Sequence, residues 1–192
     1  MPAPANNAKP PAALAHACLR WDVRPTRWLL IASVARQRLR VFEQFEPPGS
    51  RQTFPSYHLK QELILSTSRF GTGQIASSNQ TPLGLHRIAK KIGAGHPVGT
   101  VFASRRAVGL ISQGHPRAPI AHRILWLEGL EPGFNRGGEV DTYARYIYIH
   151  GIGDESTLGR PASRGCLHLA AADLLPLFDL VPGGTLVWIS RR

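Results

Sequence analysis

Apolar and polar positions alternate along much of the chain, beginning with the segment 28–42. Residues 29–31 are all apolar, and in 36–41 Leu39 and Val41 alternate with the arginines at 36, 38 and 40. Side chains on a strand point to opposite faces in turn, so this pattern predicts two strands around a polar turn. Leu39 and Val41 should face the core, and the three arginines should share the other face, which is either solvated or holds an anion.

Several further segments favour strands, and one favours a helix. Strands are predicted at 59–66, 124–127, 146–149 and 185–189. Residues 170–180 predict one short helix, although Pro176 inside it lacks a backbone N–H. Residues 93–120 contain many glycines and prolines and predict a long irregular loop, which is either disordered or one wall of a substrate cleft. These elements together predict a mainly β fold, a mixed β-sandwich with one short helix.

The composition fits one folded domain. The chain has 192 residues, 43% of them hydrophobic, which is enough to form a core without disulfides or a metal. No run of eighteen apolar residues occurs, so we expect no membrane-spanning helix. Residues 1–26, which begin with many Ala, Pro and Asn residues, predict a flexible leader, and 27–192 form the predicted domain.

The sequence of the leader also indicates whether the protein is expected to be exported from the cytoplasm. Ala15, His16 and Ala17 resemble a small-residue cleavage site, and Cys18 follows them. However, a basic region is missing and the apolar stretch is short, so we expect no secretory signal. A cytoplasmic protein is therefore expected, and a periplasmic protein whose export signal was removed is the alternative.

The net charge of +11 is unevenly distributed. Residues 1–60 and 61–120 each carry +6, whereas 121–192 carry −1. An excess of this size suggests an anionic partner such as nucleic acid, or an arginine-rich coding bias. Because no helix-turn-helix, zinc-finger or RNA-platform motif occurs, we expect no nucleic-acid partner.

The stretch 146–169 contains the most informative chemistry. The predicted strand ends at His150, and Ser163-Arg164-Gly165-Cys166 should turn tightly into the predicted helix. A cysteine just before a helix N-terminus and beside Arg164 lies in positive potential, which favours the thiolate. Gly165 would let backbone N–H groups approach a reacting carbonyl, and His150 could accept and return a proton.

Each of these residues also has a plainer interpretation. A lone cysteine is usually a small buried apolar residue, and a lone histidine at a strand end is usually structural. His150, Cys166 and His168 could be considered as zinc ligands, but no fourth ligand or paired-cysteine spacing supports this, so no metal is expected. The combination of residues is what indicates catalysis.

The combination resembles the L,D-transpeptidase catalytic domain family, also called YkuD-like, across roughly 27–190. The family signature is His-Gly followed, after a loop of this length, by Ser/Thr, His or Arg, Gly and Cys, as at His150-Gly151 and Ser163–Cys166. Residues 36–39 resemble the family's early hairpin, 81–84 its Thr-Pro-x-Gly turn, and 178–185 its closing segment.

The resemblance implies a role for each matching residue. Cys166 would be the nucleophile and His150 its general acid and base. Backbone N–H groups around Arg164, Gly165 and Cys166 would form the oxyanion hole, and Ser163 would support the turn. The residues expected to contact the substrate are Arg145, Tyr148, Gly151 and His168. The implied substrate is a peptidoglycan stem tetrapeptide, cleaved between meso-diaminopimelate and the terminal D-Ala without a cofactor.

Two positions depart from the family pattern. His168 stands where many members have Arg, and His is smaller and only partly charged near neutral pH. The substrate carboxylate must then be held from elsewhere, for which Arg145 and Arg164 are candidates. Ala170 and Ala171 also leave the predicted helix without its usual capping side chain.

The acceptor of the acyl group is left open by these motifs. Water would make the protein an L,D-carboxypeptidase, expected here as a cytosolic enzyme that trims recycled stem tetrapeptides. An amine acceptor would make it a periplasmic L,D-transpeptidase that cross-links peptidoglycan. A wall-binding module that has lost activity is a third possibility, and a basic nucleic-acid-binding module is a distant one. The oligomeric state is not indicated by the sequence.

Overall fold

The computed structural model describes residues 9–45 and 54–192, which form a mainly β fold with two α-helices. The helices are α1 (Ala12–Arg20) and α2 (Ala171–Leu180). The strands are β1 (Trp28–Ser33), β2 (Arg38–Phe45), β3 (Ser56–Ser66), β4 (Gly84–Ile92), β5 (Thr100–Ala103), β6 (Arg106–Leu110), β7 (Ala121–Gly129), β8 (Tyr148–Gly151), β9 (Leu167–Leu169) and β10 (Leu186–Ser190). Neither α-helix of these residues has the length and apolar character needed to cross a membrane.

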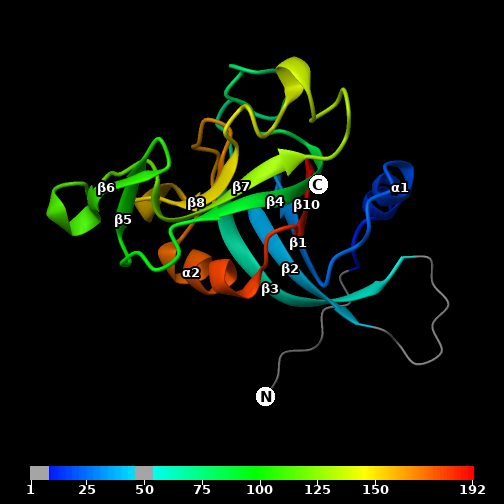
Figure 1. Ribbon diagram of the computed structural model, residues 1–192, viewed down its shortest axis with the longest axis horizontal. Helices are drawn as coiled ribbons and strands as arrows, with labels where there is room; N and C mark the ends of the chain where they lie inside the picture. The colour runs from blue at the N-terminus through cyan, green and yellow to red at the C-terminus, as the bar shows by residue number, and fades with distance from the viewer. Residues whose placement is uncertain (1–8, 46–53) are drawn as a thin grey trace.

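Eight of the strands close into a barrel. Their order is β4-β10-β1-β2-β3-β9-β8-β7, and β7 pairs with β4 to complete the ring. The remaining two strands, β5 and β6, form a hairpin that joins at β7 and projects to one side (Figure 1). Most neighbours are antiparallel, whereas β1–β10 and β8–β9 are parallel. The predicted mainly β fold is therefore confirmed.

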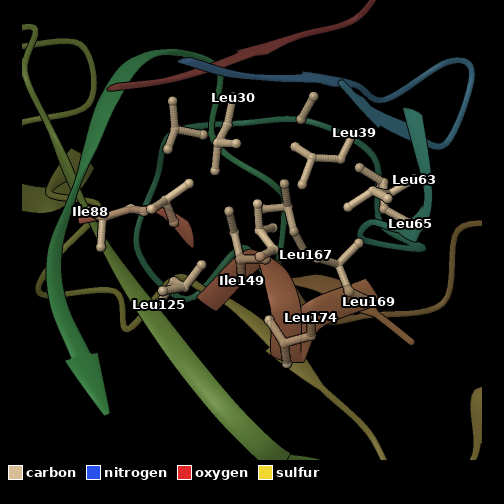
Figure 2. Packing of buried hydrophobic residues seen from close by; sticks show 14 of the residues in the cluster. Leu30, Leu39, Leu63, Leu65, Ile88, Leu125, Ile149, Leu167, Leu169 and Leu174 are labelled. Atoms are coloured by element: carbon tan, nitrogen blue, oxygen red, sulfur yellow. The ribbon is translucent and has the colours of Figure 1, made fainter. Parts of the chain in front are cut away.

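The core lies inside this barrel, where side chains from strands far apart in sequence meet (Figure 2). Leu39 and Val41 are fully buried there, as their alternation with arginine predicts. Helix α2 closes one end of the barrel with Leu174, Leu177 and Phe178. Among the arginines, Arg38 and Arg40 lie on β2 within 4.0 Å and 2.6 Å of Glu62, whereas residue 36 lies in the preceding turn.

The expected flexible leader contains a packed helix instead. Helix α1 covers the outer face of the barrel near β1 and β4, with Leu14, Ala17 and Cys18 buried (Figure 1). The outer face there is apolar, because Leu29 and Leu85 point away from the barrel interior into the same cluster as α1. A short and weakly apolar segment is stabilised as a helix by that surface. Residues 1–8 lie outside the described part.

The segment 93–120 is also more regular than predicted. It contains β5, β6 and the short 3₁₀ helix η1 (Ile111–Gln113) rather than a structureless loop. Ser104 and Arg105 connect the strands with φ values of 46° and 67°. Two left-handed residues match the twist of a hairpin, but Asn-Gly or similar pairs normally mark such turns. The Ser-Arg pair therefore gave no signal of a hairpin.

Candidate active site

Two parallel strands bring the predicted catalytic residues to the same part of the barrel. His150 lies on β8, and Cys166 immediately precedes β9. In the β8–β9 register His150 is opposite His168, and the two rings are 4.7 Å apart. The predicted direct turn from Cys166 into a helix is wrong, because β9 intervenes and α2 begins only at Ala171. The helix N-terminus therefore does not lie at the thiol.

The turn formed by residues 163–166, here called the nucleophile turn after the predicted role of Cys166, is held by Ser163. Its hydroxyl donates to the Cys166 carbonyl oxygen at 2.6 Å and accepts from the Gly165 N–H at 3.2 Å. Gly165 has φ +117°, and a Cβ there would lie 3.1 Å from Ile147 Cδ1, so the turn requires glycine. Because the Gly165 N–H is already engaged, an oxyanion at this turn would have to use neighbouring N–H groups, such as that of Arg164.

His150 is held as a neutral base. Its Nδ1 lies 2.8 Å from the Gly151 carbonyl oxygen, which can only accept, so Nδ1 carries the proton and Nε2 keeps a free lone pair. Burial lowers the pKa of His150 to about 4, and the hydrogen bond to Gly151 only partly opposes this. At neutral pH the ring can therefore accept a proton.

Cys166 is a thiol at rest. Its side chain is half-buried, and Sγ lies 3.5 Å from the Tyr146 carbonyl oxygen, to which a thiol donates. Burial raises the pKa of Cys166 to about 11, although a backbone hydrogen bond from Tyr148 and the charge of Arg145 act in the opposite direction. The expected thiolate is therefore wrong, because desolvation outweighs the nearby positive charge and no helix terminus contributes.

One cleft of about 390 Å³ contains both groups. Residues 117–120, from the segment predicted as a loop, form part of its wall. The other lining residues are Arg69, His150, Ile152, Asp154, Thr157, Ala162, Ser163, Arg164, Cys166 and His168. Within 9–45 and 54–192, no three His, Cys, Asp or Glu side chains are arranged to hold a metal ion.

Arg145 does not face this cleft. Its guanidinium donates to the carbonyl oxygens of Gln74 at 2.8 Å and Gln80 at 2.6 Å, and it lies 3.2 Å from that of Gly73. It thereby anchors the loop 73–80 and lines a second cavity of about 330 Å³, which Arg164 also borders. Its expected contact with substrate does not fit this geometry, because its donors are already engaged.

Tyr148 lies in an aromatic cluster beside the thiol. Its ring meets Trp126 edge-on at 5.4 Å, and Cys166 packs against the same cluster. Arg105, from the tip of the β5–β6 hairpin, lies 5.1 Å above Trp126 and 3.5 Å from the Tyr148 hydroxyl. The sequence did not indicate that Arg105 and Trp126 belong to this cluster, because they come together only when the β5–β6 hairpin packs against β7.

Helix α2 is capped by a distant residue. Its N-cap, Ala170, makes no side-chain hydrogen bond, as the sequence predicts. Glu155 Oε1 instead accepts from the Ala171 N–H at 2.6 Å. A carboxylate at a helix N-terminus also interacts favourably with the helix dipole. The cap is thus supplied by the loop that connects β8 to the nucleophile turn.

A neutral histidine on β8 and a cysteine immediately before the neighbouring strand β9, in one cleft of a mainly β barrel, are the arrangement of a cysteine acyltransferase type of domain. The chain belongs to the L,D-transpeptidase catalytic domain (YkuD) family, whose family model matches residues 27–189. It is 36% identical over 61 residues to YkuD of Bacillus licheniformis and 32% identical over 62 residues to YkuD of Bacillus subtilis. These matches cover 29% and 30% of this chain, and 37% and 38% of the relatives.

Solved structures share the fold. Bd1075 of Bdellovibrio bacteriovorus superposes with a TM-score of 0.53 at 15% identity, over 87% of this chain and 49% of that protein. The helical cell shape determining protein Pgp2 of Campylobacter jejuni gives a TM-score of 0.50 at 18% identity, over 86% of this chain and 48% of its own. The chain therefore spans about half the length of these proteins, and the likeness concerns the fold alone.

Proposed function

We propose that this chain is an L,D-carboxypeptidase that removes the terminal D-Ala from peptidoglycan stem tetrapeptides. The observation that carries the proposal is the pairing of β8 with β9, which brings His150 and Cys166 into one cleft with a free Nε2. Membership of the L,D-transpeptidase family supports peptidoglycan as the source of the substrate.

The first half-reaction forms a thioester. The Cys166 sulfur attacks the carbonyl carbon of meso-diaminopimelate at its L-centre, and the thiol proton passes to His150 Nε2. Backbone N–H groups of the nucleophile turn stabilise the oxyanion. When the oxyanion collapses, the C–N bond breaks, and D-Ala leaves after its amine takes the proton from His150.

The second half-reaction releases the shortened peptide. His150 accepts a proton from water as the oxygen attacks the thioester carbonyl, and the C–S bond then breaks. The sulfur recovers a proton from His150, which restores the resting thiol and neutral imidazole. An amine in place of water would give a cross-linked peptide by the same steps.

The charge of the cleft supports water as the acceptor. Three arginines and one aspartate line it, whereas His150 and His168 are neutral because burial lowers their pKa values to about 4 and about 3. A positive cleft repels the ammonium group of an acceptor peptide but does not affect water. The second cavity, beyond Arg164, favours the alternative of a transpeptidase with a separate acceptor site.

The proposed compartment is the cytosol. Residues 15–18, which resemble a processing site, lie within α1, where Ala17 and Cys18 are buried. Cleavage there would remove the buried Leu14 from the outer face of the barrel. Immunodetection in fractionated cells tests the location: recovery with cytosolic markers supports it, and recovery with periplasmic markers contradicts it.

The reaction is tested with a purified tetrapeptide, alone and with an acceptor stem peptide. Mass spectrometry should show tripeptide and free D-Ala as the main products in both incubations. Cys166→Ala should yield neither product, which shows that the reaction needs this thiol. A dominant cross-linked dimer in the presence of acceptor would establish the transpeptidase instead.

A further inference from the structure

The proposed function requires a positive group that holds the terminal carboxylate of the substrate, and two obvious candidates do not supply it. His168 lines the cleft, but burial lowers its pKa to about 3, so it is neutral near pH 7. Arg145 lies outside the cleft and donates to the loop carbonyls of Gln74 and Gln80. The positive charge must therefore come from other side chains of the cleft.

Three arginines that line the cleft form no ion pair with an acidic side chain of the described residues. Within the described residues, Arg69, Arg117 and Arg164 form no ion pair, whereas arginines elsewhere, such as Arg40 and Arg87, pair with glutamates. The single acidic side chain of the cleft, Asp154, is exposed and accepts from the Ser156 N–H. Its hydrogen bonds with Ser156 lower the pKa of Asp154, and the charge of Arg117 adds to this effect without a direct ion pair. The cleft therefore has a formal excess of two positive charges.

Arg69 is fixed next to the nucleophile turn. Its backbone N–H donates to the Ser163 carbonyl oxygen at 3.1 Å, and Ser68 forms an isolated bridge with Ser163. The Ser68 N–H in turn donates to the Thr81 hydroxyl at 3.0 Å. Backbone hydrogen bonds thus hold the base of the Arg69 side chain at a constant position relative to Cys166.

Arg117 is fixed next to the strand that carries the base. The Gly153 N–H donates to the Ala118 carbonyl oxygen at 2.8 Å. A Cβ at Gly153 would lie 2.6 Å from the Ala118 nitrogen, so the segment around Arg117 packs directly against the chain three residues after His150. Arg69 and Arg117 therefore enter the cleft from two segments that backbone hydrogen bonds attach to the chain near Cys166 and near His150, respectively.

We propose that Arg69 and Arg117 bind the C-terminal carboxylate of the peptide substrate and so restrict the enzyme to peptides with a free carboxyl end. The carboxylate of D-Ala lies one residue beyond the bond attacked by Cys166, which places it inside the same cleft. A guanidinium matches a carboxylate with two parallel N–H donors, whereas neutral His168 does not. Arg164, which borders both cavities, adds to the positive potential.

The test compares a tetrapeptide that ends in a free carboxylate with the same tetrapeptide that ends in a carboxamide. The wild-type protein should cleave the free acid with a kcat/KM about tenfold to a hundredfold higher than the amide. Arg69→Gln and Arg117→Gln should each lose most of that preference by reducing cleavage of the acid while changing cleavage of the amide little. Arg106→Gln, on the β5–β6 hairpin outside the cleft, is the matched control and should retain the preference.

A binding experiment separates this proposal from the proposed function. Cys166→Ala, which cannot react, is titrated calorimetrically with both peptides, alone and combined with Arg117→Gln or Arg117→Lys. Tighter binding of the acid, lost in the Gln variant and partly kept in the Lys variant, supports the proposal even if no D-Ala is ever released. Equal affinity of Cys166→Ala for the acid and the amide would overturn it. So would Arg69→Gln and Arg117→Gln variants that lose cleavage of the acid and of the amide to the same extent.

Discussion

The two cysteines of this chain lie in regions that differ in almost every respect except the pKa of their thiols. Burial raises the pKa to about 11 at both Cys18 and Cys166. Cys18 is buried where α1 packs on the outer face of the barrel, with Tyr57 and Leu85 in the same apolar cluster. Cys166 is half-buried in a cleft that it shares with a neutral histidine. A neighbouring base and an open cleft therefore distinguish Cys166, the proposed nucleophile, from Cys18, whereas the pKa of the resting thiol does not.

The largest expected effect separates the two thiols directly. Cys166→Ala should reduce D-Ala release by about a thousandfold or more, because no other group can form the thioester. Cys18→Ala removes only a small buried side chain and should leave kcat/KM unchanged. Product release is measured by mass spectrometry for both variants.

Labelling provides the matching control for these two variants. A carbapenem should give a single covalent adduct, on the peptide that carries Cys166, in both the wild type and Cys18→Ala. Modification of Cys18, or an unreactive Cys166 in the folded protein, would contradict the difference between the two regions.

The second prediction concerns the base that Cys18 lacks. His150→Gln can still donate to the Gly151 carbonyl but cannot accept a proton, so kcat/KM should fall by about a hundredfold to ten-thousandfold. In the wild type, activity should persist as the pH falls through 6.5 and decline only near the His150 pKa of about 4. The pH profile of D-Ala release between pH 3.5 and 8 is the measurement.

Stability must be followed at each pH in that experiment. The folded-state pKa of His150 lies below its ordinary value of 6.5, so the unfolded chain takes up a proton that the folded chain does not. Stability should therefore fall as the pH drops from about 6.5 towards 4, and tryptophan fluorescence identifies the range in which the protein is still folded. A decline of activity centred near pH 6.5, while the protein is still folded, would show that burial does not lower the pKa of His150.

The third prediction compares two glycines that both have positive φ values. A Cβ at Gly165 (φ +117°) would lie 3.3 Å from the Gln80 carbonyl oxygen, whereas a Cβ at Gly184 (φ +86°) would have no neighbour within 4 Å. Alanine at either site costs about 1–2 kcal/mol of backbone strain. Only Gly165→Ala also displaces the nucleophile turn, so its activity should fall by about a hundredfold.

Thermal unfolding and kcat/KM of the two glycine variants provide the check. Similar losses in Tm combined with very different activities would assign the effect at Gly165 to the geometry of the turn. Equal activities would mean that the turn tolerates the shift, and the role of Ser163 in fixing it would then be smaller than the hydrogen bonds indicate.

Local patterns predicted several of the strands and indicated His150 and Cys166 as the candidate catalytic pair, but they did not indicate how the strands meet or the short strands β5, β6 and β9. Alternation at Leu39 and Val41 indicates which face of β2 is buried, because side-chain direction repeats every two residues. It does not indicate the neighbouring strand, so the parallel β8–β9 pairing could not be derived from the residues around His150. The three-residue strand β9 is too short to show any period, which explains why Cys166 was expected to lead directly into a helix.

The cleft itself was the least predictable feature. Arg69 and Arg117 are far from Cys166 in sequence, and each becomes part of the site only through long-range backbone contacts to Ser163 and Gly153. The same holds for α1, whose burial depends on the apolar outer face formed by strands that follow it. Sequence spacing carries information about local geometry, whereas these contacts depend on closure of the barrel.

The smallest effect on catalysis is expected from the region of Cys18, and it tests whether burial there serves stability alone. Leu14→Ala removes a fully buried side chain between α1 and the barrel and should cost about 2–4 kcal/mol of unfolding free energy. Leu19→Ala, on the same helix but 64% exposed, should cost less than about 0.5 kcal/mol. Urea unfolding at pH 7 gives both values, and kcat/KM per folded molecule should be unchanged in each.

Equal stabilities of the two variants would show that α1 does not pack on the barrel in solution, whereas a loss of activity in Leu14→Ala would show that the outer face and the cleft are coupled. The expected result instead assigns different consequences to burial in the two regions: at Cys18 it stabilises the fold, and at Cys166 it keeps the thiol neutral until, in the proposed reaction, His150 removes the proton.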